Sequence, residues 1–72
     1  MNEELSKVVV TLNNEKGIDA VLNTAEKFDA TQITNYEGVG GKPVFEFSIA
    51  AEKEDEFAGA VTSEFVESVA KK

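Results

Sequence analysis

Four residue types are missing from this 72-residue sequence: cysteine, histidine, tryptophan and arginine. Without cysteine and histidine, the chain has no disulfides, no usual zinc or copper ligands, and no thiol or histidine catalysis. No apolar run approaches the length of a membrane span, and the acidic, polar start is unlike a signal peptide. We therefore expect one cytoplasmic, soluble domain over residues 1–72, with a tail at 1–6, that uses no metal or other cofactor and does not enter a membrane.

Positive charge is scarce as well. Fourteen Asp and Glu residues face only seven lysines, which gives a formal net charge of −7. Proteins that bind phosphate backbones need clustered cationic groups, and arginine makes many of the bidentate contacts. We expect no direct nucleic-acid binding. The plain interpretation of the acidic charge is solubility, and the alternative is a protein partner with a basic surface.

The first half of the chain predicts a strand and then a helix. Residues Lys7–Leu12 are short and β-branched, as in a buried strand. Asn13 and Asn14 then offer side chains that can cap a helix. The residues that follow place their apolar members on one helical face and Asp19, Asn23 and Glu26 on the other; that apolar face consists of Ile18, Val21, Leu22, Ala25 and Phe28.

The second half predicts two strands and a long helix. Residues 31–37 are polar on both faces, which suits the edge of a sheet. Residues 44–50 alternate strongly, with Phe45, Phe47 and Ile49 on one face. From Glu52 to about Ala70 we predict a helix; its inward side would carry Phe57, Val61, Phe65 and Val69.

This order predicts an α+β fold of the βαββα type. The arrangement is a three-stranded sheet with two helices on one face, that is, a ferredoxin-like split βαβ unit lacking its fourth strand. The first strand would then lie at an open edge of the sheet. Open edges are normally paired or covered, so Val8, Val9 and Val10 are candidates for pairing with a second copy or a partner's strand.

The glycine-rich stretch Gly38–Lys42 invites comparison with a phosphate-binding loop. A Walker-type loop needs a Ser or Thr after the lysine and a helix after the loop, and here Pro43 and a strand follow. We therefore predict a hairpin turn in which glycines accommodate positive φ and Pro43 begins the next strand. Contact of a partner with Tyr36, Gly38 and Gly40 at this tip stays open.

The predicted last helix is rich in acidic residues. Glu52, Glu56, Glu64 and Glu67 are candidates for a docking stripe that fits a basic groove. The alternative is an ordinary solvated helix face. Acid–base catalysis by two of these carboxylates would need a cleft to shift one pKa, and no feature of the sequence supplies one, so we predict no catalytic residues.

The stretch Gln32-Ile33-Thr34-Asn35-Tyr36-Glu37-Gly38-Val39-Gly40 resembles the second strand and G-x-G exit of regulatory domains of the PII and ACT type. Residues 44–50 and 52–70 are similar to the later strand and helix of those domains. The long effector loop is a short turn here, and the basic nucleotide-binding residues have no counterpart. The resemblance implies a non-catalytic regulatory module that works as an oligomer, without an ATP site.

A looser resemblance, to small acidic modulators of the recombinase filament and to phage-encoded inhibitors, lies in the same element order and the acidic end. It implies imitation of a nucleic acid. Two hypotheses follow. The first is a non-enzymatic regulatory or protein-binding module that forms a homo-oligomer through a sheet edge. The second is an acidic inhibitor that occupies the basic groove of a nucleic-acid-binding protein.

Overall fold

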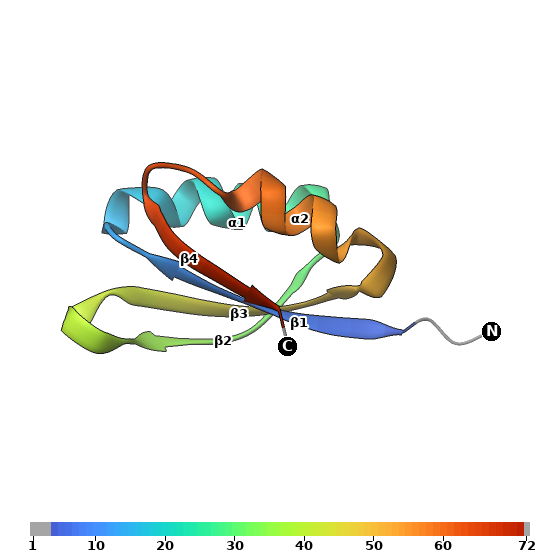
Figure 1. The fold of residues 1–72 in the computed structure, drawn as a ribbon, viewed down its shortest axis with the longest axis horizontal. Coiled ribbons are helices and arrows are strands. Elements are labelled where there is room, and N and C mark those ends of the chain that lie inside the picture. Colours follow the sequence, from blue (N-terminus) through green and yellow to red (C-terminus); the bar gives the residue numbers. More distant parts are fainter. Residues whose placement is uncertain (1–3, 72) are drawn as a thin grey trace.

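The computed structural model describes residues 4–71, which form one antiparallel sheet covered on one side by two α-helices (Figure 1). The strand order is β2-β3-β1-β4, and each neighbouring pair is antiparallel. The elements in chain order are β1 (Leu5–Leu12), α1 (Ile18–Lys27), β2 (Thr31–Glu37), β3 (Pro43–Ala50), α2 (Glu54–Val61) and β4 (Val66–Lys71). This is the ferredoxin-like βαββαβ arrangement with all of its strands.

The predicted three-stranded sheet without a fourth strand was wrong. The helix expected over residues 52–70 ends at Val61, and Val66–Lys71 form β4, which pairs with β1. Thr62 and Ser63 follow the helix, and both residue types are weaker helix formers than alanine. Phe57 and Val61 do lie on the buried side of a helix, but Val69 reaches the same side of the sheet from a strand.

The prediction that β1 forms an open edge was therefore wrong too. Its residues pair with β3 on one side and with β4 on the other. Val8 and Val10 are fully buried in the core, and Val9 is buried on the opposite face of the sheet. None of the three is available for pairing with a second chain. The edges of the sheet among the described residues are β2 and β4.

Other local predictions were confirmed. The side chain of Asn14 accepts a hydrogen bond from the backbone amide of Lys16 at 2.9 Å, ahead of α1. β2 spans Thr31–Glu37 at the sheet edge, and β3 lies between β2 and β1. The hairpin between them turns through Gly40 and Gly41, both at φ 75°, as positive φ requires of glycine.

The core lies between the sheet and the helices. Val8, Val10 and Leu12 of β1 alternate toward it, and so do Phe45, Phe47 and Ile49 of β3; α1 and α2 add Val21, Ala25, Phe57 and Val61. Phe57 stands at the centre, with its ring centroid 5.5 Å from that of Phe47 and 5.8 Å from that of Phe28, both edge to face. Edge-to-face contacts of this kind add to the stabilisation that burial of the ring provides.

We predict that Phe57→Ala lowers the free energy of unfolding by about 3–5 kcal/mol, because it opens a cavity between the rings of Phe28 and Phe47. That is a large share of the stability of a small domain. Urea denaturation followed by circular dichroism measures the change. Val39→Ala, at a side chain that is 96% exposed, is the control and should unfold as the native protein does. Equal loss in both variants would contradict this packing.

Two glycines provide a second, paired prediction. A Cβ on Gly59, within α2, would meet no atom within 4 Å, so Gly59→Ala should stabilise the protein by about 0.5–1 kcal/mol. A Cβ on Gly17 would lie 2.6 Å from the Cβ of Phe65, so Gly17→Ala should destabilise it. Thermal unfolding of the two variants is expected to shift in opposite directions. A downward shift for Gly59→Ala would contradict the position of α2.

Candidate functional site: the open face of the sheet

The side of the sheet that faces away from α1 and α2 is called here the open face (Figure 1). Because side chains alternate along a strand, the residues between the core positions point to it. From β1 and β3 these are Lys7, Val9, Thr11, Val44, Glu46 and Ser48. On the edge strands, the residues that pair with these positions lie on the same face; they are Thr34, Tyr36, Ser68 and Ala70. None of the described elements covers this face.

The centre of the open face is apolar. Val9 is 8% exposed and Val44 is 5% exposed, yet neither belongs to the core cluster on the other side of the sheet. Their neighbours in the sheet are small or polar side chains, including Thr11, Thr34 and Ser68. Val9 and Val44 are therefore almost covered from solvent, and the side chains around them form most of the surface of this face.

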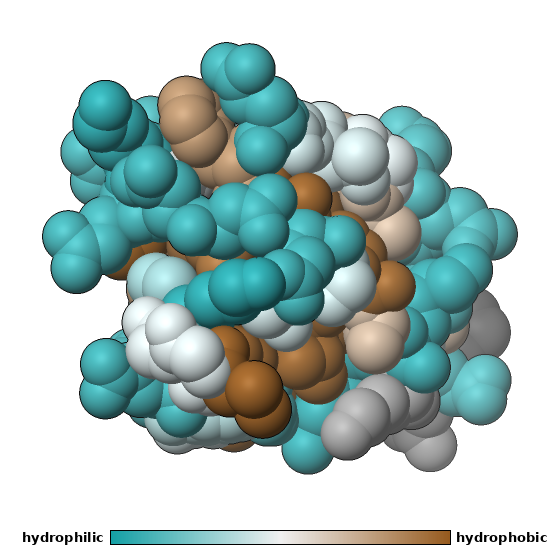
Figure 2. Space-filling view, turned by 60° about the vertical axis from the view of Figure 1, so that its left-hand side comes forward, coloured by the Kyte–Doolittle hydropathy of each residue, from teal (hydrophilic) through white to brown (hydrophobic). Residues whose placement is uncertain are grey.

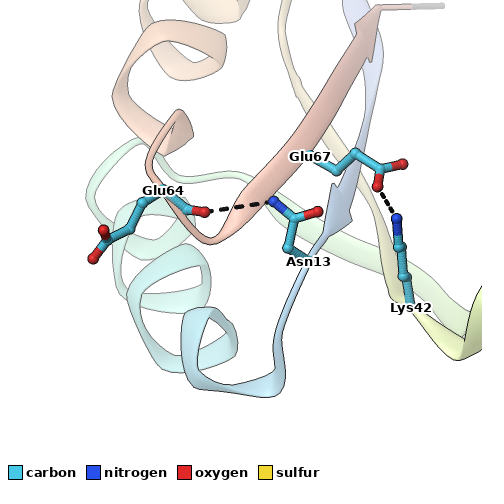
Figure 3. Close-up of polar contacts among 4 residues, drawn as sticks. All are labelled: Asn13, Lys42, Glu64 and Glu67. Carbon is cyan, nitrogen blue, oxygen red and sulfur yellow. Dashed lines mark hydrogen bonds and ion pairs between the residues drawn. The ribbon is translucent and has the colours of Figure 1, made fainter.

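Two ion pairs border this apolar centre. Lys7 Nζ lies 3.4 Å from Glu46 Oε1. Lys42, just before β3, donates a hydrogen bond to the carboxylate of Glu67 on β4, and the two side chains point toward each other in Figure 3. Each lysine thus has an acidic partner, so these four groups carry no net charge within a chain of net charge −7.

Tyr36 lies where the open face meets the exposed edge strand β2. Its side chain is 48% exposed, and Val44 is its partner residue in β3. Partial desolvation and then the carboxylate of Glu46, as hydrogen-bond acceptor and as negative charge, raise the pKa of Tyr36. Tyr36 therefore stays a neutral hydrogen-bond donor over a wide pH range, with an apolar ring beside Val44.

The prediction that acidic residues form a continuous docking stripe along a single helix was wrong. Glu52 lies just before α2 and Glu56 lies in its first turn, and both are exposed. Glu64 lies in the turn after α2, and Glu67 lies on β4, at the other end of the sheet. These four carboxylates do not share one helix flank.

The turn that carries Glu64 is tied to the end of β1. The backbone amide of Asn13 donates to the carbonyl oxygen of Phe65 at 2.7 Å, and Asn13 Nδ2 donates to the carbonyl oxygen of Glu64 at 3.5 Å. The carboxylate of Glu64 points away from this contact (Figure 3). The backbone contacts of this turn thus hold the start of β4 against β1, while the carboxylate is free to face solvent.

The other end of β4 is held by Lys71, whose Nζ lies 2.5 Å from Asp55 Oδ1 of α2. The hydrogen bond from Lys71, and then its charge, lower the pKa of Asp55; the same pair raises the pKa of Lys71. Glu67 and Lys71 therefore do not pair with each other, as they would at adjacent turns of a helix. Both termini of β4 are fixed by side chains from other elements.

The glycine candidates lie in the β2–β3 hairpin. The Gly38 amide donates to the Lys42 carbonyl oxygen at 2.7 Å, and a Cβ on Gly38 would lie 2.8 Å from Val44 Cγ2. Gly38 is thus required for close packing of the hairpin. A Cβ on Gly40 would meet nothing within 4 Å, so Gly40 is at the free tip beside the exposed Val39.

A cavity of about 360 Å³ lies between the hairpin and the start of α1. Ile18 and Phe45 line it with apolar surface, and Glu15, Asn35 and Glu37 line it with polar groups. Its lining includes two carboxylates and no lysine, which does not suit a phosphate group. The geometry agrees with a hairpin rather than a phosphate-binding loop at Gly38–Lys42.

Sequence reasoning gave no site role to Lys7, Lys42 and Glu46 on the open face, and it assigned Asn13 to a helix cap rather than to the contact with the turn before β4. Glu46 could have been placed on the open face from alternation alone, because it lies between the core residues Phe45 and Phe47, and Lys7 likewise directly precedes the core residue Val8. Their pairing depends on the β1–β3 register. The contact between Lys42 and Glu67 forms only because Glu67 lies on β4. The sequence was predicted to be helical there, so this contact could not be predicted.

Residues 4–71 contain no group of three or more Asp or Glu side chains placed to hold a metal ion. Within the same part of the chain, the helices are too short or too polar to cross a membrane.

No protein-family model and no curated protein sequence matches the chain. Among solved structures, it is similar to a phospho-2-dehydro-3-deoxyheptonate aldolase (DAHP synthase) from Thermotoga maritima, with a TM-score of 0.68 and 20% sequence identity. The match covers 94% of this chain and 20% of the aldolase chain, so this chain spans about a fifth of that protein's length. At this identity the likeness shows the fold alone, that of a small α+β antiparallel-sheet domain.

The position of Tyr36 can be tested by titration, because the sequence contains a single tyrosine and no tryptophan. We predict that the phenol of Tyr36 ionises above the ordinary tyrosine pKa, measured by ultraviolet absorbance against pH. Glu46→Gln removes the neighbouring charge and should move this pKa downward, leaving the effect of desolvation. Glu37→Gln is the matched control on the same hairpin. An equal shift in both variants would contradict the contact between Tyr36 and Glu46.

Proposed function

We propose that this chain is a non-enzymatic regulatory module that binds another protein through the open face of its sheet. The observation that carries the proposal is the exposed Tyr36 on that face, whose neighbour Val44 and the nearby Val9 are apolar and almost covered from solvent. Protein interfaces combine an apolar centre with a polar rim and are enriched in tyrosine. The ion pairs Lys7–Glu46 and Lys42–Glu67 supply such a rim.

The chemistry of the open face supports binding over catalysis. Its acidic groups are a phenol whose pKa is raised and two carboxylates that each face a lysine, beside the hydroxyls of serine and threonine. Nucleophilic catalysis needs a nucleophile activated by an adjacent base, and the phenol is instead held in its neutral form. These residues can donate, accept and pack, as a binding surface requires.

The structural likeness supports an accessory role. The same fold occurs within a chain about five times as long, the DAHP synthase, in which it accounts for 20% of the residues. A domain of this kind that accompanies a larger catalytic chain is suited to regulation. We infer a regulatory relation to a protein partner and transfer neither the aldolase reaction nor its substrate.

The alternative, an acidic inhibitor that enters a basic groove, has less support. Of the four glutamates first considered, only Glu52 and Glu56 lie together, beside Asp55, which pairs with Lys71. Glu67 pairs with Lys42 on the other side of the sheet. A mimic of a nucleic acid would need these charges in one continuous row.

We predict that Tyr36→Ala removes binding of the partner, because the ring supplies exposed apolar area beside Val44. Immobilised native protein and variants would be used to capture partners from lysate of the source cells, with quantification by mass spectrometry. Asn23→Ala, exposed on α1, is the matched control and should retain the same partner. Retention of the partner by Tyr36→Ala at the native level would contradict the proposal, as would its loss in Asn23→Ala alone.

A further inference from the structure

The edge strand β2 is exposed along its whole length. All seven residues of Thr31–Glu37 are exposed, although β3 beside it contributes much of the core. One side of β2 pairs with β3, and no described element pairs with the other side. Its outward backbone amides and carbonyls are thus free for another strand.

Two exposed apolar side chains lie on β2. Among the described residues, the large hydrophobic side chains with high exposure are Leu5, Ile33, Tyr36 and Val39, and Ile33 and Tyr36 belong to β2. Figure 2 shows apolar surface gathered within a mostly polar face of the molecule. Apolar surface of this kind marks an interaction site when it is grouped rather than scattered.

The charge on β2 favours association with an identical chain. Its sequence, TQITNYE, contains only one charged residue, Glu37, and neither lysine nor proline. Lysine and proline are the residues that commonly protect an edge strand from pairing. The other edge strand, β4, contains Glu67 and Lys71, which are both engaged in ion pairs. For a chain of net charge −7, β2 is therefore an edge at which two copies can meet with little repulsion.

We propose that β2 is a self-association edge, at which a second copy of this chain pairs its own β2 in the antiparallel direction. Antiparallel pairing of one strand with its copy closes with twofold symmetry, so it gives a dimer and not an open fibre. The β-bulge between Gln32 and Thr34 leaves Thr34–Glu37 as the regular part of the strand for this pairing. Ile33 lies beside this segment and loses water on association.

The dimer has a consequence for partner binding, and this one step rests on the proposed function. A twofold axis perpendicular to the joined sheets keeps the helices of both copies on one side and both open faces on the other. The two copies of Val9, Val44 and Tyr36 then form one extended surface. Such a surface can bind two sites of a symmetric partner at once, which increases the apparent affinity.

The test is the mass of the full chain in solution, measured by sedimentation from micromolar to millimolar concentration. The native protein should pass from monomer to dimer. Ile33→Lys introduces a charge at the edge that both copies share, and it should raise the dissociation constant of the dimer at least about tenfold. Val39→Lys likewise replaces an exposed apolar side chain with lysine, but at the hairpin tip outside the strand, so this variant should dimerise like the native protein.

Ile33 and Val39 are both exposed, so circular dichroism of the two variants should equal that of the native protein. A native chain that stays monomeric at millimolar concentration would overturn the proposal. So would an Ile33→Lys variant that dimerises as well as Val39→Lys. Partner capture is measured separately with the native protein, and a native chain that captures a partner but stays monomeric would overturn the dimer while leaving the proposed function standing.

Discussion

The pairing of β1 on both of its edges is the constraint on which the rest of this structure depends. β1 supplies Val8, Val10 and Leu12 to the core, and a strand buried so deeply must satisfy its backbone hydrogen bonds within the protein. β3 satisfies one edge, and Val66–Lys71 satisfy the other as β4. The contacts of Asn13 with the turn before β4, and of Lys71 with Asp55, hold that last strand in place.

This arrangement also determines which surfaces remain for binding. With β1 enclosed, the unpaired edges are β2 and β4, and β4 is the one whose charged side chains are engaged with other elements. With both helices on one side, the other side of the sheet keeps Val9 and Val44 at its centre. Tyr36 belongs to both remaining surfaces, since it lies on β2 and beside Val44. The proposed partner binding and the proposed self-association thus involve the same part of the fold.

Several elements could be predicted because their signals are local. The spacing of apolar residues from Ile18 to Phe28 is typical of a helix, and the alternation of Phe45, Phe47 and Ile49 is typical of a strand. The glycines before Pro43 required a turn. Phe57, Val61, Phe65 and Val69 misled because their four-residue spacing suits a helix. In the structure Phe57 and Val61 lie on α2, and Val69 reaches the core from β4. The candidate site suffered from the same error, because Glu67 was assigned to a helix and its partner Lys42 was left without a role.

The amino-acid sequence alone determined that the protein is acidic and has no cysteine or histidine chemistry. It also predicted an α+β fold with a tight hairpin at its glycines. It also determined that the outer edge of the first strand needed a partner. Only the tertiary structure decided that the partner is the chain's own last segment. The physical reason is that local preference at Val66–Lys71 is weak, while the free hydrogen-bonding edge and apolar face of β1 lie far away in sequence and become adjacent only on folding.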